Sequence, residues 1–256
     1  MRRIFVPPEA VSGNSISVCG DDVKHMRDVL RMKSGDKVTA TCGRGMNYDC
    51  VIGEISEDMI TLNVVAETPD TSELPVSLIL FQALPKSDKM DVIIQKAVEL
   101  GASEIVPMRS ARSVMRLDEA KAAKKVVRWR RISEEAAKQS GRGIIPDVTD
   151  VVDFDEAVAI AKRCDRILIP YELCEKAVSM EELHETISEI MQAGSIGVFI
   201  GSEGGFERHE VDRVCEAGGR MISLGHRILR TETAGPAVLS VLMMLIEDKM
   251  NRIAVY

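Results

Sequence analysis

The chain has 256 residues, of which 45% are hydrophobic, so it is long enough to bury a sizeable core in one large domain or two modest ones. Its formal net charge of −7 argues against a generic nucleic-acid binder, and no apolar run reaches the roughly 18 to 20 residues that span a bilayer. The first residues, MRRIFVPPEAVSGN, lack the apolar stretch of a signal peptide, so we expect a cytoplasmic protein.

Six cysteines are scattered along the chain without a Cys-x-x-Cys pair or a His at metal-ligand spacing. They are Cys19, Cys42, Cys50, Cys164, Cys174 and Cys215. This pattern predicts reduced, small hydrophobic side chains rather than a disulfide framework or a zinc site, and we expect no metal.

Short β-rich runs separated by turn signals make up the chain before about residue 70. The runs cover 2–6, 16–20, 36–43, 46–55 and 59–67. One helix is predicted over 21–32, with the apolar residues of one face at Val23, Met26, Val29 and Leu30. The pattern indicates a small β-barrel, followed by a linker with the sequence TPDTSELP at 68–75.

From Val76 onward, strands and helices alternate. The near-continuous apolar run 76–84 is typical of a strand buried on both faces, and Ser87 is placed to cap the next helix. That helix carries an apolar stripe at 90, 93, 94, 97 and 98, and Gly101 suits its C-terminal end. Further strands are predicted at 103–108, 165–170, 195–201 and 220–225, and helices at 118–141, 153–163, 180–193 and 207–217. This alternation predicts an α/β domain with a mostly parallel sheet, whose ligands collect at the carboxyl ends of the strands.

A basic segment interrupts the otherwise acidic chain. Residues 109–142 hold eleven Lys or Arg and four Asp or Glu, which leaves 22 basic and 36 acidic residues elsewhere. A solvated helix face is the ordinary explanation of such a segment. Three features favour phosphate binding: Arg outnumbers Lys seven to four, the single Trp lies in RWRR at 128–131, and the loop SGRGIIP follows at 140–146.

Three predicted strands end in unusual loops, which are IPYE at 169–172, IGSEGGFERHE at 200–210 and LGHRILRTETAG at 224–235. If the strands are parallel, all three loops leave the sheet at the same edge. The second loop is rich in glycine, which allows the backbone to approach a ligand closely. It lacks the Walker and the G-x-G-x-x-G spacing, and Glu203 would repel a polyphosphate. A ligand with hydroxyls or a positive centre fits better, and a glycine turn needed only for packing is the alternative.

The third loop is denser in Arg, Thr and Glu than helix capping requires. Thr231 or Thr233 can cap the next helix, but capping does not explain Arg227, Arg230 and Glu232 beside them. The run that follows, 237–246, is apolar on nearly every side, so it is a central buried helix or a subunit interface. A rigidly backed polar loop of this kind favours a binding site.

Two motifs, FIGSEGGFERHEVD at 199–212 and LGHRILRTETAGPAVLSVL at 224–242, carry a family resemblance. They resemble the signature of the SPOUT-type ribosomal RNA methyltransferases that form N3-methyluridine in the 16S RNA of the small subunit. The segments 25–36, 86–114 and 128–148 are similar to the same family, so the resemblance covers almost the whole length. One position departs from it, because Ser202 stands where the family usually has Pro.

The resemblance implies a PUA-like β-barrel at 1–72 that binds RNA, and a SPOUT domain at 73–256 with a parallel sheet and a deep trefoil knot. It further implies a homodimer that binds S-adenosylmethionine among the three loops and methylates N3 of a specific uridine during ribosome biogenesis. Carried over position by position, the cofactor-binding residues are Ile200, Gly201, Glu203, Gly204, Leu224, Gly225, Ile228, Leu229, Arg230 and Ala234.

Charged side chains are candidates for the chemistry, because the uridine imide must lose its proton during transfer. Glu203 and Glu232 are candidate bases, and Arg230 or Arg142 can stabilise the negative charge that develops on the ring. RNA contacts are expected to be mostly to phosphates, with affinity that falls steeply with salt. The candidate RNA-binding residues are Arg2, Arg3, Arg31, Arg112, Arg116, Arg128, Arg130, Arg131 and Arg142.

Two alternatives stay open. A SPOUT enzyme of this kind can act on another RNA or on a ribose 2′-oxygen. A relative that keeps the fold without catalysis can serve as an RNA-binding assembly protein, and such a relative should have lost cofactor binding. The sequence favours an enzyme, because the loop residues other than Ser202 are intact.

Overall fold

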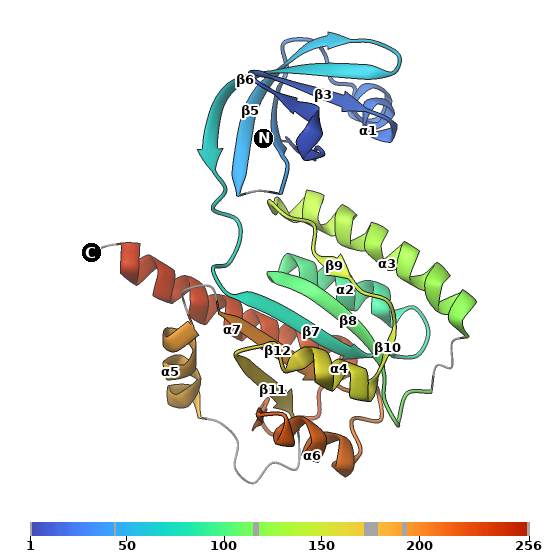
Figure 1. The fold of residues 1–256 in the computed structure, drawn as a ribbon, viewed down its shortest axis with the longest axis vertical. Coiled ribbons are helices and arrows are strands. Elements are labelled where there is room, and N and C mark those ends of the chain that lie inside the picture. The colour runs from blue at the N-terminus through green and yellow to red at the C-terminus, as the bar shows by residue number, and fades with distance from the viewer. Residues whose placement is uncertain (1, 44, 115–117, 172–178, 191–193, 255–256) are drawn as a thin grey trace. The chain divides into compact units, whose positions relative to one another are not determined.

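The computed structural model of the chain describes residues 2–43, 45–114, 118–171, 179–190 and 194–254. The chain divides into two compact units, each built on its own sheet (Figure 1). Unit 1 comprises 1–73 and 137–145, and unit 2 comprises 74–136 and 146–256. The boundary predicted after residue 72 lies beside the first division, and unit 1 also takes in a segment from the middle of the chain.

Unit 1 contains short helices and a six-stranded sheet. Its strands are β1 (Arg2–Phe5), β2 (Val11–Ser12), β3 (Ser15–Cys19), β4 (Lys37–Thr41), β5 (Met46–Ile55) and β6 (Met59–Pro69), in the order β1-β4-β5-β6-β3-β2. Ile16 pairs with Leu62 and Val18 with Ile60 across β3 and β6, and all four side chains are buried. Each predicted run overlaps one of these strands, and alternate side chains of the strands form the core.

The helix predicted over 21–32 is shorter and irregular. A 3-10 turn, η1 (Pro8–Ala10), precedes it, and the helix itself consists of α1 (Asp21–Lys24) followed by a π-turn, η2 (His25–Val29). Val23 and Met26 are buried as predicted, but Val29 was wrongly placed on the buried face and is 67% exposed. A π-turn holds more residues than an α-helical turn, so later side chains rotate away from the 3.6-residue stripe.

Unit 2 consists of a parallel sheet with helices on both faces, which confirms the predicted α/β domain. The strands are β7 (Ser77–Ala83), β8 (Ala102–Arg109), β9 (Asp147–Val148), β10 (Val152–Asp153), β11 (Arg166–Pro170), β12 (Ser195–Ile200) and β13 (Gly219–Ile222). The helices are α2 (Lys89–Glu99), α3 (Glu119–Ser140, whose last residues belong to unit 1), α4 (Phe154–Ala161), α5 (Met180–Ile190), α6 (Arg208–Glu216) and α7 (Thr231–Ala254). The strand order is β10-β8-β7-β12-β11-β13, and β9 pairs with β8. All the pairs are parallel.

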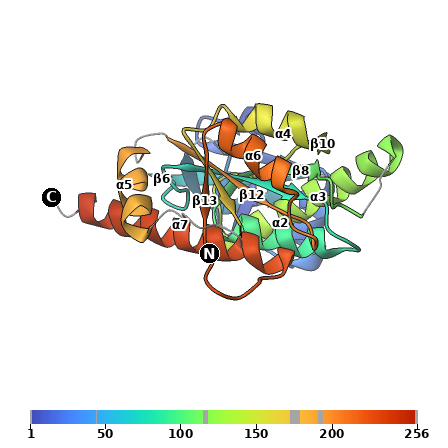
Figure 2. The ribbon, with the colours of Figure 1, turned by 90° about the horizontal axis from the view of Figure 1, so that it is seen from below.

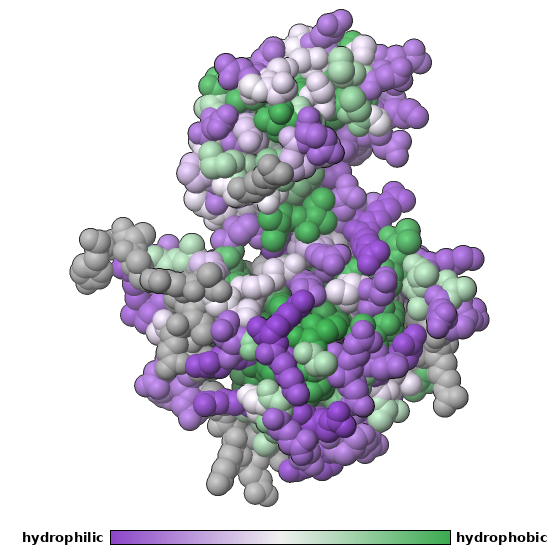
Figure 3. Space-filling model, in the orientation of Figure 1, coloured by the Kyte–Doolittle hydropathy of each residue, from purple (hydrophilic) through white to green (hydrophobic). Residues whose placement is uncertain are grey.

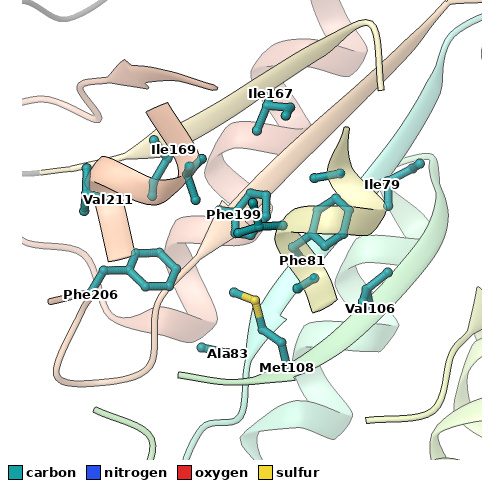
Figure 4. Packing of buried hydrophobic residues seen from close by; sticks show 14 of the residues in the cluster. Ile79, Phe81, Ala83, Val106, Met108, Ile167, Ile169, Phe199, Phe206 and Val211 are labelled. Atoms are coloured by element: carbon teal, nitrogen blue, oxygen red, sulfur yellow. The ribbon is translucent and has the colours of Figure 1, made fainter. Parts of the chain in front are cut away.

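Successive side chains of the central strand β7 face different layers of helices. Phe81 stacks on Phe199 of β12 with ring centroids 4.6 Å apart, in a cluster that includes α4 and α6 (Figure 4). Figure 2 shows α4 and α6 on one side of the sheet and α2 and α7 on the other. Burial on both faces accounts for the continuous apolar run at 76–84.

The stripe predicted for α2 is confirmed, since its buried residues are Met90, Ile93, Ile94, Ala97 and Val98. Gly101 follows the helix with a φ of 88°, as expected for a C-terminal glycine. The predicted cap is wrong. Ser87 has a φ of 59°, and the N-cap residue is Asp88, which makes no side-chain capping hydrogen bond.

In the described part of the chain, one face of unit 2 is mostly hydrophilic (Figure 3), and the cysteine side chains are thiols rather than disulfides. The face of unit 2 drawn in Figure 3 is mostly hydrophilic around a hydrophobic patch. No described helix is long and apolar enough to cross a membrane, and the described residues hold no cluster suited to a metal ion. Cys19, Cys42, Cys50, Cys164 and Cys215 are free thiols, and burial raises the pKa of Cys50 and Cys164 to about 11. Cys174 lies outside the described residues.

Candidate cofactor-binding site

A pocket in unit 2 lies where β11, β12 and β13 end, at the edge of the sheet that the sequence predicted. Its lining residues are Pro170, Tyr171, Ile200, Gly201, Ser202, Gly205, Phe206, Ser223, Leu224, Gly225, Arg227, Ile228, Leu229, Thr231 and Ala234. The structure therefore brings all three predicted loops together. Of the ten residues predicted to hold a cofactor, seven line the pocket, and Glu203, Gly204 and Arg230 do not.

The lining combines apolar side chains with hydroxyls and exposed backbone. Tyr171 and Phe206 are more than nine-tenths buried, whereas Ile228 is 87% exposed on the third loop. Among the described lining residues, Arg227 is the one that carries a charge. Apolar walls with a few polar groups suit a small organic ligand that has ring and hydroxyl groups, whereas a polyphosphate would require more cations.

Glycine at position 201 is required by close backbone packing. A Cβ on Gly201 would lie 2.9 Å from the backbone of Gly205, which is closer than real Cβ contacts. The backbone N–H of Gly205 donates to the Ser202 carbonyl at 2.9 Å, and Gly205 itself has a φ of 68°. Close packing thus explains Gly201, and the left-handed backbone conformation explains Gly205.

Thr231 connects the second and third loops at the pocket wall. Its hydroxyl donates to the carbonyl oxygen of Gly201 at 2.6 Å and accepts from Nε2 of Gln82 at 3.0 Å. Both side chains are almost fully buried. Thr231 is the first residue of α7, which begins earlier than the apolar run at 237–246 predicted. Its hydroxyl therefore joins the start of α7 to the second loop and to β7, which is not the capping role proposed from the sequence. Gln82 was not predicted, and its one signal was a polar residue inside an apolar strand.

An ionic cluster beside the pocket contains both candidate bases. Nζ of Lys89, in the first turn of α2, lies 3.1 Å from Oε1 of Glu203 and 3.1 Å from Oε2 of Glu232. The backbone N–H of Lys86 also donates to Oε1 of Glu203, at 3.1 Å. Lys89 was missed in the sequence, because nothing in a helix pattern indicates contact with loops more than a hundred residues away.

The cluster keeps both carboxylates ionised. Burial acts to raise the pKa of Glu203, but its own backbone N–H and Lys89 outweigh burial and hold the pKa below its ordinary value. The pKa of Glu232 is lowered by its own backbone N–H and by Lys89, against the effect of burial. Hydrogen bonds to the two carboxylates raise the pKa of Lys89. A carboxylate with a lowered pKa is a weak base, so neither Glu is well suited to accept an imide proton.

Ser202, which departs from the family pattern, fastens the second loop to the segment after β8. Its hydroxyl donates to the Arg112 carbonyl oxygen at 3.1 Å. Arg112 in turn donates from Nη1 to the Gly204 carbonyl oxygen at 2.7 Å and from Nε to Glu207 at 2.8 Å. A proline at position 202 could not donate this bond, so Ser202 adds a contact that holds the glycine loop in place.

The other predicted catalytic residues have different surroundings. The Arg230 side chain is 83% exposed, and its Nη1 lies 4.0 Å from Oε1 of Glu232. Arg142 belongs to unit 1, where it is 5% exposed and its guanidinium pairs with Glu73. The catalytic roles of both stay predictions, and Arg142, which is itself buried, already has a structural partner in Glu73.

Most of the predicted RNA-binding arginines are paired with acidic residues. The pairs are Arg3 with Asp70, Arg112 with Glu207, Arg128 with Asp91, Arg130 with Asp150, and Arg131 with Glu135. Arg31 is exposed, Arg116 lies outside the described residues, and of Arg2 the structure describes the backbone. Trp129 was wrongly read as a sign of phosphate binding, because it is 1% exposed and belongs to the core.

Comparisons with known proteins match both units. The family model described as RNA methyltransferase domain matches residues 72–243, and the RNA methyltransferase PUA domain matches residues 18–65. "Ribosomal RNA small subunit methyltransferase E" of Bacillus subtilis is 36% identical over 237 residues, which cover 91% of this chain and 93% of that protein. The protein of the same name from Buchnera aphidicola subsp. Schizaphis graminum is 30% identical over 96% of this chain and 97% of its own length.

Two solved structures resemble the whole chain. The Ribosomal RNA small subunit methyltransferase E from Neisseria gonorrhoeae, bound to S-adenosyl methionine, has a TM-score of 0.81 and 29% identity over 96% of this chain and 98% of that one. A methyltransferase from Legionella pneumophila in complex with the same cofactor has a TM-score of 0.80 and 29% identity over 94% and 96%.

Proposed function

The chain belongs to the RNA methyltransferase family, and on that premise we propose that it transfers a methyl group from S-adenosylmethionine to N3 of a specific uridine in 16S rRNA of the small ribosomal subunit. The observation that carries the proposal is the pocket at the ends of β11, β12 and β13. Seven residues that the family resemblance assigns to the cofactor line it, and the two solved structures described above hold S-adenosylmethionine.

The residues present fit this cofactor. Adenine and ribose suit the apolar walls around Ile200 and Leu229 and the hydroxyls of Ser223 and Thr231, and the cofactor has no phosphate that would need a cluster of cations. Glu203 and Glu232 are ionised beside the pocket, which favours a ligand with a cationic centre.

Bound S-adenosylmethionine supplies a methyl group already activated by its sulfonium. The protein then contributes mostly positioning and the exclusion of water. The turn at Gly201 and the bond from Thr231 fix the pocket wall, and Arg230 extends from the third loop, where it can stabilise negative charge on a uracil oxygen. Glu203 and Glu232 act through their charge, since their lowered pKa values weaken them as bases.

The rest of the assignment follows the family resemblance. We place RNA binding on the PUA-like unit and on the arginines of the basic segment, with the target uridine unpaired or flipped out. The C-terminal part of unit 2 is proposed to form a trefoil knot. The homodimer interface is proposed on α7, where Val241 is 40% and Met244 65% exposed although both are apolar. An enzyme of ribosome biogenesis acts in the cytoplasm.

Methylation of small ribosomal subunits tests the proposal. Subunits from cells that lack the enzyme are incubated with the protein and labelled S-adenosylmethionine, and the modified nucleotide is mapped by mass spectrometry. We expect one N3-methyluridine in 16S rRNA. A methyl group on a ribose or on another RNA would overturn the substrate assignment, and a protein that binds no S-adenosylmethionine would be an assembly factor instead.

Replacement of Arg230 by Ala tests the role of that residue in the same assay. Arg230 is mostly exposed and its nearest acidic partner is 4.0 Å away, so the variant should fold and bind the cofactor while methyl transfer is lost. Normal turnover in the variant would remove Arg230 from the mechanism.

A further inference from the structure

We propose that Lys89 is a positioning residue for the cofactor pocket, which it supports from outside by holding the carboxylates of Glu203 and Glu232. The inference rests on the proposed function, because the pocket ligand is taken to be S-adenosylmethionine. Lys89 itself does not line the pocket, and although it lies in the segment 86–114 that resembles the family, the sequence assigned it no role.

Each of the two carboxylates lies beside the pocket wall, Glu203 in the second loop and Glu232 in the first turn of α7, where the third loop ends. Glu203 follows Ser202, and Glu232 follows Thr231, and both of these neighbours line the pocket. The loops are joined once on the pocket side, through the Thr231 hydroxyl and the Gly201 carbonyl. Lys89 joins them a second time, from α2. A third element of the fold therefore fixes the distance between the two loops.

The cluster depends on the cation at its centre. Since both carboxylate oxygens lie 3.1 Å from one nitrogen, the two negative charges are within roughly 6 Å of each other and would repel without it. Oε2 of Glu232 is buried and lies 3.1 Å from Nζ of Lys89, so its charge relies on Lys89. Arg230, at 4.0 Å from the other oxygen of Glu232, is mostly exposed and is a weaker substitute.

Replacement of Lys89 by Met removes the charge and keeps the length of the side chain. The two loops should separate, and the dissociation constant for S-adenosylmethionine, measured by titration calorimetry, should rise about tenfold, as expected for a lost charged hydrogen bond. Lys89→Arg keeps a cation and should restore most of the affinity. Lys96→Met is the matched control, because Lys96 lies on the same helix and pairs with Glu99, and it should leave the affinity unchanged.

A double-mutant cycle separates positioning from direct contact. If Lys89 acts through the two carboxylates, then Lys89→Met should change cofactor affinity less than about twofold in a Glu203→Gln, Glu232→Gln background. A full loss in that background would mean that Lys89 contacts the cofactor or the RNA itself, and would overturn the proposal. Unchanged affinity of Lys89→Met in the wild-type background would overturn it as well.

Folding and the premise are checked separately. Melting temperatures without cofactor show whether each variant folds, and Lys89→Gln, which keeps a donor without a charge, gives the same test should Lys89→Met fail to fold. If the wild-type protein binds no S-adenosylmethionine, both the proposed function and the role of Lys89 in cofactor binding are wrong. If the wild-type protein binds and the cycle shows no coupling, the role of Lys89 fails alone.

Discussion

Single polar groups at the pocket wall connect several segments of the chain through hydrogen bonds. The Thr231 hydroxyl serves two buried partners at once, the carbonyl of Gly201 and the amide of Gln82. Nε2 of Gln82 also donates to the carbonyl oxygen of Ala83 at 2.9 Å, whereas Oε1 of Gln82 is buried without a hydrogen-bond partner. A buried group that loses its partner costs more free energy than the bond contributed, which makes this position sensitive to a change of a few atoms.

Thr231→Val tests this arrangement because valine keeps the shape and removes the hydroxyl. It removes the donor to the Gly201 carbonyl and one of the two acceptors of the Gln82 amide, so the free energy of unfolding should fall by about 1 to 3 kcal/mol. Chemical denaturation measures the change. Thr233→Val, an exposed position two residues later, is the control and should change stability little. Equal stability of the two variants would show that the hydroxyl has no such role.

The ionic cluster at Lys89 predicts a particular dependence on pH. The folded-state pKa values of Glu203 and Glu232 are lowered, so their contribution is present above the ordinary carboxyl pKa and is lost as the pH falls through the folded values. The pKa of Lys89 is raised, so its contribution persists at neutral pH and disappears only as the pH rises through the folded value.

The difference in melting temperature between wild type and Lys89→Met isolates this cluster. It should stay constant between about pH 6 and pH 9 and shrink in acid, where the carboxylates become protonated. Thermal unfolding monitored by circular dichroism across that range provides the measurement. A difference that changes near neutral pH would show that another titrating group controls these loops.

At the level of elements, the surface around the basic helix α3 carries less positive charge than the sequence of α3 alone suggests. Arg128, Arg130 and Arg131 each have an acidic partner, and two of these partners come from outside α3. The charge of a surface is the sum over elements that meet there, and a count along one segment omits the acids that fold against it. The body of the protein thus offsets part of the predicted basic patch.

Because of these acidic partners, we expect RNA binding to depend less steeply on salt than the sequence alone predicted. If all nine candidate arginines contacted phosphates of single-stranded RNA, the slope of log K against log salt concentration would be roughly −6. We expect the measured slope of this protein to be clearly smaller in magnitude. Binding measured over a series of KCl concentrations gives the slope. Asp91→Asn combined with Asp147→Asn and Asp150→Asn releases Arg128 and Arg130 from their acidic partners and should steepen it. A slope of the full magnitude in the wild-type protein would mean that RNA displaces the acidic partners.

The elements themselves could largely be predicted from local pattern. The stripe of α2 and the doubly buried β7 carry strong periodic signals, and the structure has both where they were expected. The strands β9 and β10 have two residues each, too few for any period to show. The π-turn at His25–Val29 moved Val29 to the surface because the local winding differs from the α-helical repeat assumed for it.

The candidate site also has parts that could be predicted from the sequence and parts that could not. Its three loops could be placed, because parallel strands bring their carboxyl ends to one edge of the sheet. Lys89 and Gln82 could not, since their partners lie more than a hundred residues later in the chain and the contacts depend on how α2 and β7 pack. A pattern within a short stretch of sequence carries no information about contacts between distant residues. The ionised state of Glu203 and Glu232 depends on one such contact, the one with Lys89.

At the scale of the whole molecule, α7 leaves apolar surface without cover in a single chain. Val238, Leu239, Leu242 and Ile246 are buried, whereas Val241 and Met244 face outward. The sequence showed an apolar helix and could not separate core from interface. The structure assigns one side of the helix to the core, and the proposed homodimer would cover the other side.

Val241→Glu combined with Met244→Glu should convert a dimer into monomers, because two carboxylates cannot be buried unpaired in an apolar interface. Sedimentation velocity measures the oligomeric state, and methyl transfer should fall with dimerisation. Val127→Glu on α3, also an exposed apolar residue, is the matched control and should leave the state unchanged. A wild-type protein that sediments as a monomer at all concentrations would remove the dimer from the proposal.

The composition of unit 1 has a consequence for anyone who wishes to express it as a separate fragment. Glu73 accepts hydrogen bonds from Arg142 and from the backbone N–H groups of Gly143 and Ile144, and the Thr41 hydroxyl donates to the Gly143 carbonyl. A gene truncated after codon 73 would encode all six strands without these partners. A faithful fragment needs the 137–145 peptide grafted on or supplied in trans, so the recombinant boundary of this domain cannot be a single cut in the reading frame.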